Sequence, residues 1–153
     1  MEQKYLNIAQ IGIVVENMET TIGAMKNLFH ILPDTESSAK RLRHYGGKDV
    51  EVEAKIATYQ FANIEVEFIE PVSGESLWHD YLREHGSGAH HIQFSVPDYE
   101  EAVSDFQKAG YQVSMSGDSV RAIPGLKWAY FDTERDMGLS MVVFNDREVE
   151  KTK

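Results

Sequence analysis

The sequence contains no cysteine among its 153 residues, which excludes disulfide bonds, thiolate metal sites and thiol nucleophiles. No stretch approaches the roughly 18 consecutive apolar residues that indicate a membrane-spanning helix. Basic residues are also scarce: 15 lysines and arginines stand against 25 aspartates and glutamates, and the net charge of −10 would repel a nucleic-acid backbone. We therefore expect a cytoplasmic protein that has neither a membrane nor a nucleic acid as its partner.

Positive charge is concentrated in one segment, which contains Lys40, Arg41, Arg43, His44 and Lys48. The segment is polar and shows no clear hydrophobic periodicity, so we interpret it as a solvated loop. The charges leave one alternative open, a binding site for a small anion.

The sequence does contain an internal repeat, in which AQIGIVVENMETTIGAMKNL, from Ala9, can be aligned with HHIQFSVPDYEEAVSDFQKA, from His90. Each copy is a β-branched run, a polar break and then a helical pattern. Both helices are amphipathic, with apolar residues at helical spacing on one face. These are Met18, Ile22, Met25 and Phe29 in the first helix and Tyr99, Ala102, Val103 and Phe106 in the second.

Capping residues mark the ends of these helices. Asn17 is a predicted N-cap, Asp98 with Glu101 forms a capping box, and Gly110 lies where the second helix should end. Strand-like runs follow at 51–61 and 64–70 in the first half and at 111–115, 128–132 and 139–145 in the second. A linking helix is predicted over about residues 75–86. The pattern indicates an α+β fold: a single domain, 1–153, made of two βαβββ repeats, 5–71 and 88–146.

Strand alternation separates two faces of the predicted sheet, because successive side chains point to opposite sides. In the first strand and its repeat, apolar residues alternate with a second series that includes Gln10, His91 and Gln93. The helices need an apolar surface to cover, so the second series should face the uncovered side and line a cleft. Four positions converge there by this reasoning: Gln10, Glu67, His91 and Val142. His90 has the opposite parity and should pack behind the sheet.

The segments AQIGIVV, VEFIEP, GSGAHHIQFSV and AYFDTERDMGLSMVVFND resemble the vicinal oxygen chelate superfamily, which includes glyoxalases, bleomycin resistance proteins and dioxygenases. Within it, the chain is most similar to methylmalonyl-CoA epimerases and to small racemases of isoflavanones. The resemblance implies that both modules form one cupped mixed sheet.

The same resemblance implies metal ligands at the four convergent positions. Gln10, Glu67 and His91 match the ligand pattern, whereas Val142 stands where relatives usually carry a glutamate. Two alternatives follow: a divalent metal such as Co, Mn, Ni or Zn held by the three remaining ligands, or a metal-free hydrogen-bonded cluster. No organic cofactor is expected.

The resemblance further implies an epimerase or racemase that exchanges a proton at a carbon α to a carbonyl through an enolate-like intermediate. Glu67 is the candidate base, and His91, with Gln10 or a metal, is the candidate for stabilising the oxyanion. A second acid could come from Glu53, Lys55, His44 or Tyr59. The alternatives are a glyoxalase-like lyase, which the apolar Val142 disfavours most, and a non-catalytic small-molecule binding or resistance protein.

Six residues are the candidate contacts for a small carbonyl substrate: Gln10, Gln93, Tyr59, Trp128, Tyr130 and Phe144. The aromatic members favour a flat, neutral compound, since the negative net charge does not favour the anionic conjugates of coenzyme A or glutathione. An acyl-CoA is the conventional alternative for this family. Relatives commonly form homodimers, and we expect one here.

Overall fold

The computed structural model describes residues 4–5, 7–118 and 126–145, in which the chain forms eight strands and four helices. Their bounds are β1 (Ile8–Val14), α1 (Met18–Phe29), β2 (Thr35–Tyr45), β3 (Lys48–Gln60), β4 (Glu65–Ser73), α2 (Leu77–His85), β5 (Gly88–Val96), α3 (Tyr99–Lys108), β6 (Val113–Asp118), β7 (Lys127–Phe131), α4 (Glu134–Met137) and β8 (Ser140–Asn145). No helix in these ranges is both long and apolar enough to cross a membrane.

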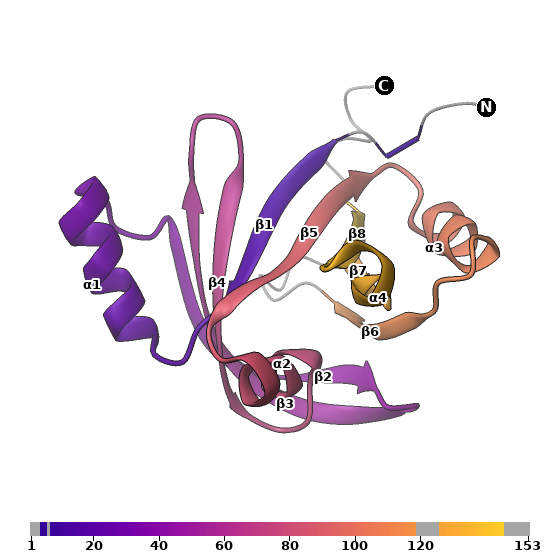
Figure 1. Ribbon diagram of the computed structural model, residues 1–153, viewed down its shortest axis with the longest axis horizontal. Helices are drawn as coiled ribbons and strands as arrows, with labels where there is room; N and C mark the ends of the chain where they lie inside the picture. Colours follow the sequence, from indigo (N-terminus) through magenta and orange to yellow (C-terminus); the bar gives the residue numbers. More distant parts are fainter. Residues whose placement is uncertain (1–3, 6, 119–125, 146–153) are drawn as a thin grey trace.

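All eight strands belong to one closed sheet with the order β1-β4-β3-β2-β6-β7-β8-β5. β1 pairs in parallel with β4 and antiparallel with β5, and β5 pairs in parallel with β8. The two halves therefore meet at β1 and β5, which lie side by side in Figure 1 with α1 and α3 on opposite sides of them. This mixed, cupped sheet confirms the predicted α+β fold class.

The helices α1 and α3 cover the outer faces of the two halves. Under α1 lies a cluster that includes Met18, Met25 and Tyr59, and under α3 lies one that includes Ala102 and Phe131. The clusters also include Ile13 and Val15 of the first strand region and Phe94 and Val96 of its repeat, so in both copies the apolar series faces a helix.

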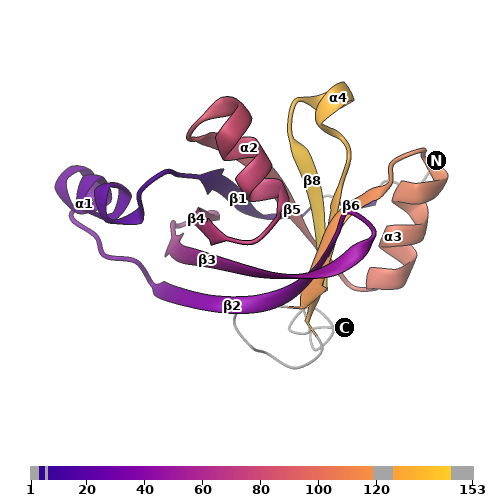
Figure 2. The same cartoon turned by 90° about the horizontal axis from the view of Figure 1, so that it is seen from below.

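A third cluster fills much of the inside of the barrel, and α2 contributes Trp78 to it. Figure 2 shows α2 on the concave side of β3 and β4. The other members come from the inward positions of six strands: Val14, Val52, Ala54, Ile56, Ile69, Met115, Trp128, Tyr130 and Val142. The linking helix therefore closes part of the expected cleft.

The basic segment predicted as a solvated loop is the strand β2. It pairs with β3 in unbroken antiparallel register from Thr35 opposite Thr58 to Tyr45 opposite Lys48. The loop prediction was wrong because β2 places arginines, not apolar residues, on its inward face, which removes the alternation by which a strand is recognised. This strand completes the βαβββ order of the first half.

Side chains cap the N-termini of the first three helices. Asn17 Oδ1 accepts a hydrogen bond from Thr20 N at 3.0 Å in α1, and Asp98 Oδ1 accepts one from Glu101 N at 2.9 Å in α3, which confirms both predicted N-caps. Ser76 does the same for α2. α3 ends one residue earlier than predicted, with Ala109 as its C-cap and Gly110 following at φ 98°.

Candidate active site

Three polar side chains from β1, β4 and β5 meet inside the barrel: Gln10, Glu67 and His91 are only 5%, 9% and 1% exposed. Gln10 Nε2 donates hydrogen bonds to Glu65 Oε1 at 2.7 Å and to Glu67 Oε2 at 3.4 Å. His91 Nε2 lies 3.5 Å from Glu67 Oε1. We call Gln10, Glu65, Glu67 and His91 the carboxylate cluster. Strand parity predicts this convergence, although Glu65 was not among the expected site residues.

Two buried atoms of this cluster, Gln10 Oε1 and His91 Nε2, make no hydrogen bond with the part of the chain that the structure describes. A buried polar atom that lacks a hydrogen bond costs free energy, so such atoms occur mainly where a ligand or another function accounts for them. Both atoms belong to side chains that lie next to Glu67. The cluster therefore has unused capacity to bind a polar group of a ligand beside a carboxylate.

The imidazole of His91 occupies a space that exists only because its partner on β1 is glycine. Gly12 is opposite His91 across the β1–β5 pairing. A Cβ atom at Gly12 would lie only 1.8 to 2.3 Å from three atoms of the imidazole ring. Gly12 has no predictable role in the sequence alone, because a glycine in a strand indicates a close approach without identifying what approaches.

The other ring nitrogen of His91 also has two polar neighbours. His91 Nδ1 lies 3.1 Å from His90 Nδ1 and 3.4 Å from the hydroxyl of Tyr130, which itself accepts from Trp78 Nε1 at 3.2 Å. Burial, and then the charge of Glu67, raises the pKa of Tyr130 well above its usual value, so this phenol keeps its proton and can donate to His91. We infer that Nδ1 accepts from Tyr130, which places the ring hydrogen of an uncharged imidazole on Nε2, the nitrogen nearer Glu67.

His90 lies beside His91 instead of behind the sheet. The β1–β5 register shifts between Gly12 and Ile13, so His90 falls in a bulge, where strict alternation of side chains does not hold. Its ring contacts Tyr81 and Tyr130 at centroid distances of 5.1 and 5.7 Å. Burial, with His91 as a smaller cause, lowers the pKa of His90 to about 3, so His90 is neutral near pH 7.

The predicted substrate contacts are divided between two places. Trp128 and Tyr130 lie in the barrel interior with their rings edge to face at 5.3 Å, and Gln93 and Phe144 are half-buried at inward positions of β5 and β8. Tyr59 is a correction: it is buried under α1, where it packs against Phe68. The parity of β3 turns Tyr59 toward the helix and away from the carboxylate cluster.

The other candidates for a second acid also lie away from the cluster. Lys55 Nζ lies 3.6 Å from Glu70, His44 Nδ1 lies 3.2 Å from Asp49, and Glu53 accepts from Ser73 at 3.4 Å. These contacts are on the outer side of β2, β3 and β4, because their positions have outward parity. Glu65 shares its inward parity with Glu67 and is the additional carboxyl that parity could have identified.

Residues 9–130 match the sequence profile of the Glyoxalase/Bleomycin resistance protein/Dioxygenase superfamily. The chain belongs to this superfamily. The match confirms the resemblance inferred from the sequence motifs. No curated protein sequence is significantly similar to the chain.

Solved structures with the same fold include two methylmalonyl-CoA epimerases. The enzyme from Streptomyces coelicolor in complex with 2-nitronate-propionyl-CoA has a TM-score of 0.69 at 16% identity over 92% of this chain and 94% of that one. The enzyme from Mycobacterium tuberculosis has a TM-score of 0.69 at 11% identity over 95% and 92%. A hypothetical protein from Bacillus halodurans has a TM-score of 0.64 at 19% identity over 92% and 94%. At these identities the likeness shows the fold alone.

Many members of the superfamily use a divalent metal, but the donor set of this chain does not fit a four-ligand chelate. Val142, at the fourth position, is fully buried in the interior cluster with Trp78 and Tyr130. Gln10 turns its amide nitrogen toward two carboxylates, and the tautomer inferred from the Tyr130 contact leaves His91 with an N–H in place of a lone pair on the side of Glu67. Within the described residues, no three His, Cys, Asp or Glu side chains form a metal-binding group. We therefore derive no chemical step through a metal.

Proposed function

We propose that this superfamily member is an isomerase, an epimerase or racemase that exchanges a proton at a carbon α to a carbonyl. The observation that carries the proposal is that the buried Glu67 carboxylate lies 3.5 Å from Nε2 of the buried His91. The first group can accept a proton and the second can donate a hydrogen bond to an oxygen, and deprotonation beside a carbonyl needs both. The epimerase fold of the structural neighbours is consistent with this assignment.

In the proposed reaction the substrate carbonyl oxygen accepts a hydrogen bond from His91 Nε2. Glu67 removes the α-proton, the C–H electron pair becomes the enolate π bond, and negative charge develops on the oxygen that His91 contacts. The low polarity of the barrel interior strengthens that hydrogen bond, because little water competes for it. Tyr130 and His90 hold Nδ1 as an acceptor and so maintain the donor at Nε2.

Inversion also requires an acid that returns a proton to the opposite face of the enolate. Glu65 is our candidate, since the amide of Gln10 links it to Glu67 on the same side of β4. Reprotonation by Glu67 would restore the original configuration, whereas reprotonation by Glu65 would invert it. The aromatic side chains Trp128, Tyr130 and Phe144 support a substrate with a flat or apolar body. The homodimer expected from the family resemblance stays a prediction.

Two probes test the function: a single enantiomer of a chiral isoflavanone and a single epimer of methylmalonyl-CoA, each incubated with the protein in deuterated water. We expect deuterium at the α-carbon and loss of optical purity with at least one probe. Glu67→Gln should lower both rates by at least about a hundredfold, since general-base catalysis contributes roughly 10²–10⁴. Glu65→Gln should abolish inversion while deuterium still enters.

Glu53→Gln is the matched control, because Glu53 lies on the outer side of the sheet and contacts Ser73. It should leave both rates within about twofold of the wild type. Undiminished exchange in Glu67→Gln would contradict the base assignment. Saturable binding of a probe without any exchange would instead indicate a non-catalytic binding protein.

A further inference from the structure

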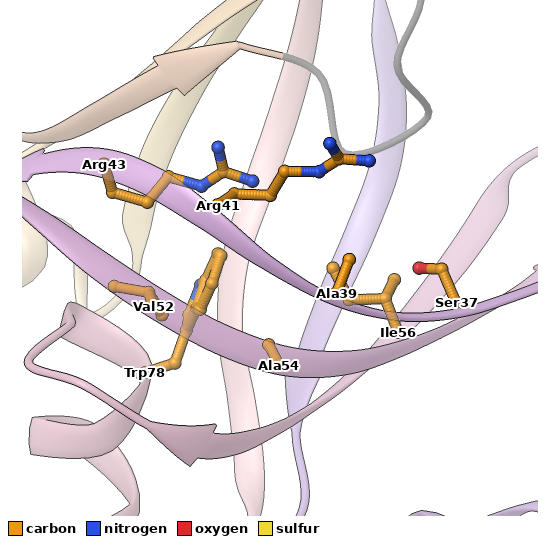
Figure 3. Close-up of a pocket in the computed structure, with 8 residues that line it drawn as sticks. All are labelled: Ser37, Ala39, Arg41, Arg43, Val52, Ala54, Ile56 and Trp78. Atoms are coloured by element: carbon orange, nitrogen blue, oxygen red, sulfur yellow. The ribbon is translucent and has the colours of Figure 1, made fainter.

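The linking helix α2 belongs to neither repeat, yet its Trp78 reaches the polar site inside the barrel. Trp78 is only 3% exposed, and Figure 3 shows its side chain extending from the helix into the interior beside Val52. Its Nε1 donates a hydrogen bond to the hydroxyl of Tyr130 at 3.2 Å, and the two rings meet edge to face at a centroid distance of 6.2 Å. The helix therefore supplies a hydrogen bond to a residue that itself contacts His91.

The Tyr130 hydroxyl lies between Trp78 and His91. Its oxygen is 3.2 Å from Trp78 Nε1 and 3.4 Å from His91 Nδ1. The rings of Tyr130 and His91 also meet edge to face, with their centroids 5.0 Å apart. Among the described residues, this hydroxyl has these two hydrogen-bonding partners, one on each side.

The two partners give the hydroxyl a direction, because an indole N–H can only donate. Trp78 therefore occupies a lone pair of the Tyr130 oxygen and leaves the phenol hydrogen for the other partner. His91 Nδ1 can accept that hydrogen only when the imidazole carries its own hydrogen on Nε2. The opposite tautomer would bring two N–H groups to one oxygen and leave the phenol hydrogen without an acceptor, which is costly in a buried site.

The other neighbours of the His91 ring do not fix its tautomer in this way. His90 Nδ1 lies 3.1 Å from His91 Nδ1, and a hydrogen between two imidazole nitrogens can belong to either ring. The Glu67 carboxylate lies 3.5 Å from Nε2 without a hydrogen bond to it, so it favours a hydrogen there only through its charge. The donor-only indole is the neighbour that adds direction to the contacts at Nδ1.

We propose that Trp78 is a positioning residue, whose indole N–H directs the Tyr130 hydroxyl to His91 Nδ1 and so keeps the imidazole hydrogen on Nε2. The use of that hydrogen by a substrate oxygen rests on the proposed isomerase function, whereas the tautomer itself does not. Successive donors in such a chain polarise one another, which makes the Nε2–H a stronger donor than that of an isolated imidazole. The linking helix thus acts on the site through one hydrogen bond.

Replacing Trp78 by 3-benzothienylalanine tests this role, because the analogue keeps the bicyclic ring and has sulfur in place of the N–H. Trp78→Phe is a second variant that also lacks the donor. The nitrogen-15 chemical shifts of the His91 ring, assigned by their absence in His91→Gln, show which nitrogen carries the hydrogen at about pH 8, where histidine is normally uncharged. We expect the Nε2–H form in the wild type and a substantial Nδ1–H fraction in both variants.

Tyr130→Phe interrupts the same chain of contacts and separates positioning from packing. Alone, it should also raise the Nδ1–H fraction. In its presence the replacement of Trp78 should cause no further change, because the indole acts on His91 only through the Tyr130 hydroxyl. If the isomerase proposal holds, replacing Trp78 should lower kcat for deuterium uptake by about threefold to tenfold, the worth of one neutral hydrogen bond, with KM within about twofold.

Tyr45→Phe is the matched control, because the Tyr45 hydroxyl donates to Asp80 on α2 and makes no contact with the chain from Trp78 to His91. It should leave the His91 shifts and kcat as in the wild type. A wild-type ring with its hydrogen on Nδ1, unchanged His91 shifts after replacement of Trp78, or an equal change in Tyr45→Phe would overturn the proposal. So would an undiminished effect of Trp78 in the Tyr130→Phe background. The expected tautomer changes in a protein without exchange activity would refute the isomerase function and leave the role of Trp78 standing.

Discussion

The orientation of His91 depends on neighbours on several strands. Gly12 leaves space for the ring on β1, His90 and Tyr130 contact Nδ1, and Glu67 lies near Nε2. Because the contacts at Nδ1 determine which nitrogen carries the hydrogen, they also determine whether His91 offers a donor or a lone pair to a ligand. The chemistry of His91 is therefore a property of this whole set of residues.

Gly12→Ala tests the space beneath the ring. The added methyl group would overlap the imidazole, so we expect a loss of about 1–3 kcal/mol in the free energy of unfolding, typical of overpacking, together with slower α-proton exchange. Urea unfolding and the deuterium assay measure the two effects. Gly23→Ala is the control, since a Cβ there meets nothing within 4 Å in α1. It should stabilise the protein by roughly 0.5–1 kcal/mol. Wild-type stability in Gly12→Ala would show that the ring can move aside.

The lowered pKa of His90 predicts that the free energy of unfolding depends on pH. Burial, chiefly, lowers its pKa to about 3 from the ordinary 6.5, so between these values the unfolded chain binds a proton that the folded protein does not. The free energy of unfolding is therefore unaffected by His90 above pH 6.5. It falls as the pH drops toward 3, by up to about 1.4 kcal/mol per pH unit.

Urea unfolding at about pH 7 and about pH 5 measures this loss. His90→Gln should lose less stability between the two values than the wild type does. His85→Gln, at an exposed position at the end of α2, should keep the wild-type dependence. Identical pH dependences in His90→Gln and the wild type would assign the effect to other groups.

Among the elements, α2 has the largest influence on the barrel interior. This helix is short, yet it inserts Trp78 into the barrel. The ring centroid of Trp78 lies 6.2 Å from those of both Trp128 and Tyr130. The helix begins at Ser76, whose buried hydroxyl accepts from His79 N at 3.1 Å. The N-cap of α2 therefore fixes the position from which Trp78 enters the barrel.

Ser76→Ala should lower the free energy of unfolding by about 1 kcal/mol, the usual cost of removing an N-cap. It should also change the near-ultraviolet circular dichroism, since both tryptophans lie in the cluster that α2 completes. Asp98→Ala removes the corresponding cap of α3 and should cost a similar amount without that spectral change, because α3 packs on the outer face. Equal spectral changes in both variants would contradict the proposed role of α2.

At the scale of the whole molecule, net charge and local charge suggest different ligands. The net charge of −10 argues against an anionic ligand, but exposed charges are screened over about 8 Å at physiological ionic strength. A buried charge is screened far less, so the guanidinium of Arg43, which is only 4% exposed, acts on its neighbours inside the barrel more strongly than the surface charges do. The interior thus combines the carboxylates of Glu65 and Glu67 with the buried guanidinium of Arg43.

Local patterns in the sequence predicted much of this protein. Helical periodicity and capping residues located α1 and α3, and strand parity placed Gln10, Glu67 and His91 on one inward face. These predictions succeed because helix formation and side-chain alternation depend on residues close together in the chain. The internal repeat and the sequence motifs were then enough to predict the superfamily.

Pairing between distant segments decided the rest. β2 became a strand because β3 offers it a complete hydrogen-bonding partner, and a shift of register against β1 brought His90 beside His91. Tyr59 went to the core under α1, and the tautomer of His91 follows from Tyr130, far along the chain. None of these has a local signature, because register, bulges and buried hydrogen bonds depend on which strands become neighbours. The sequence therefore determined the elements and the inward face, and the tertiary structure determined what the residues on that face can do.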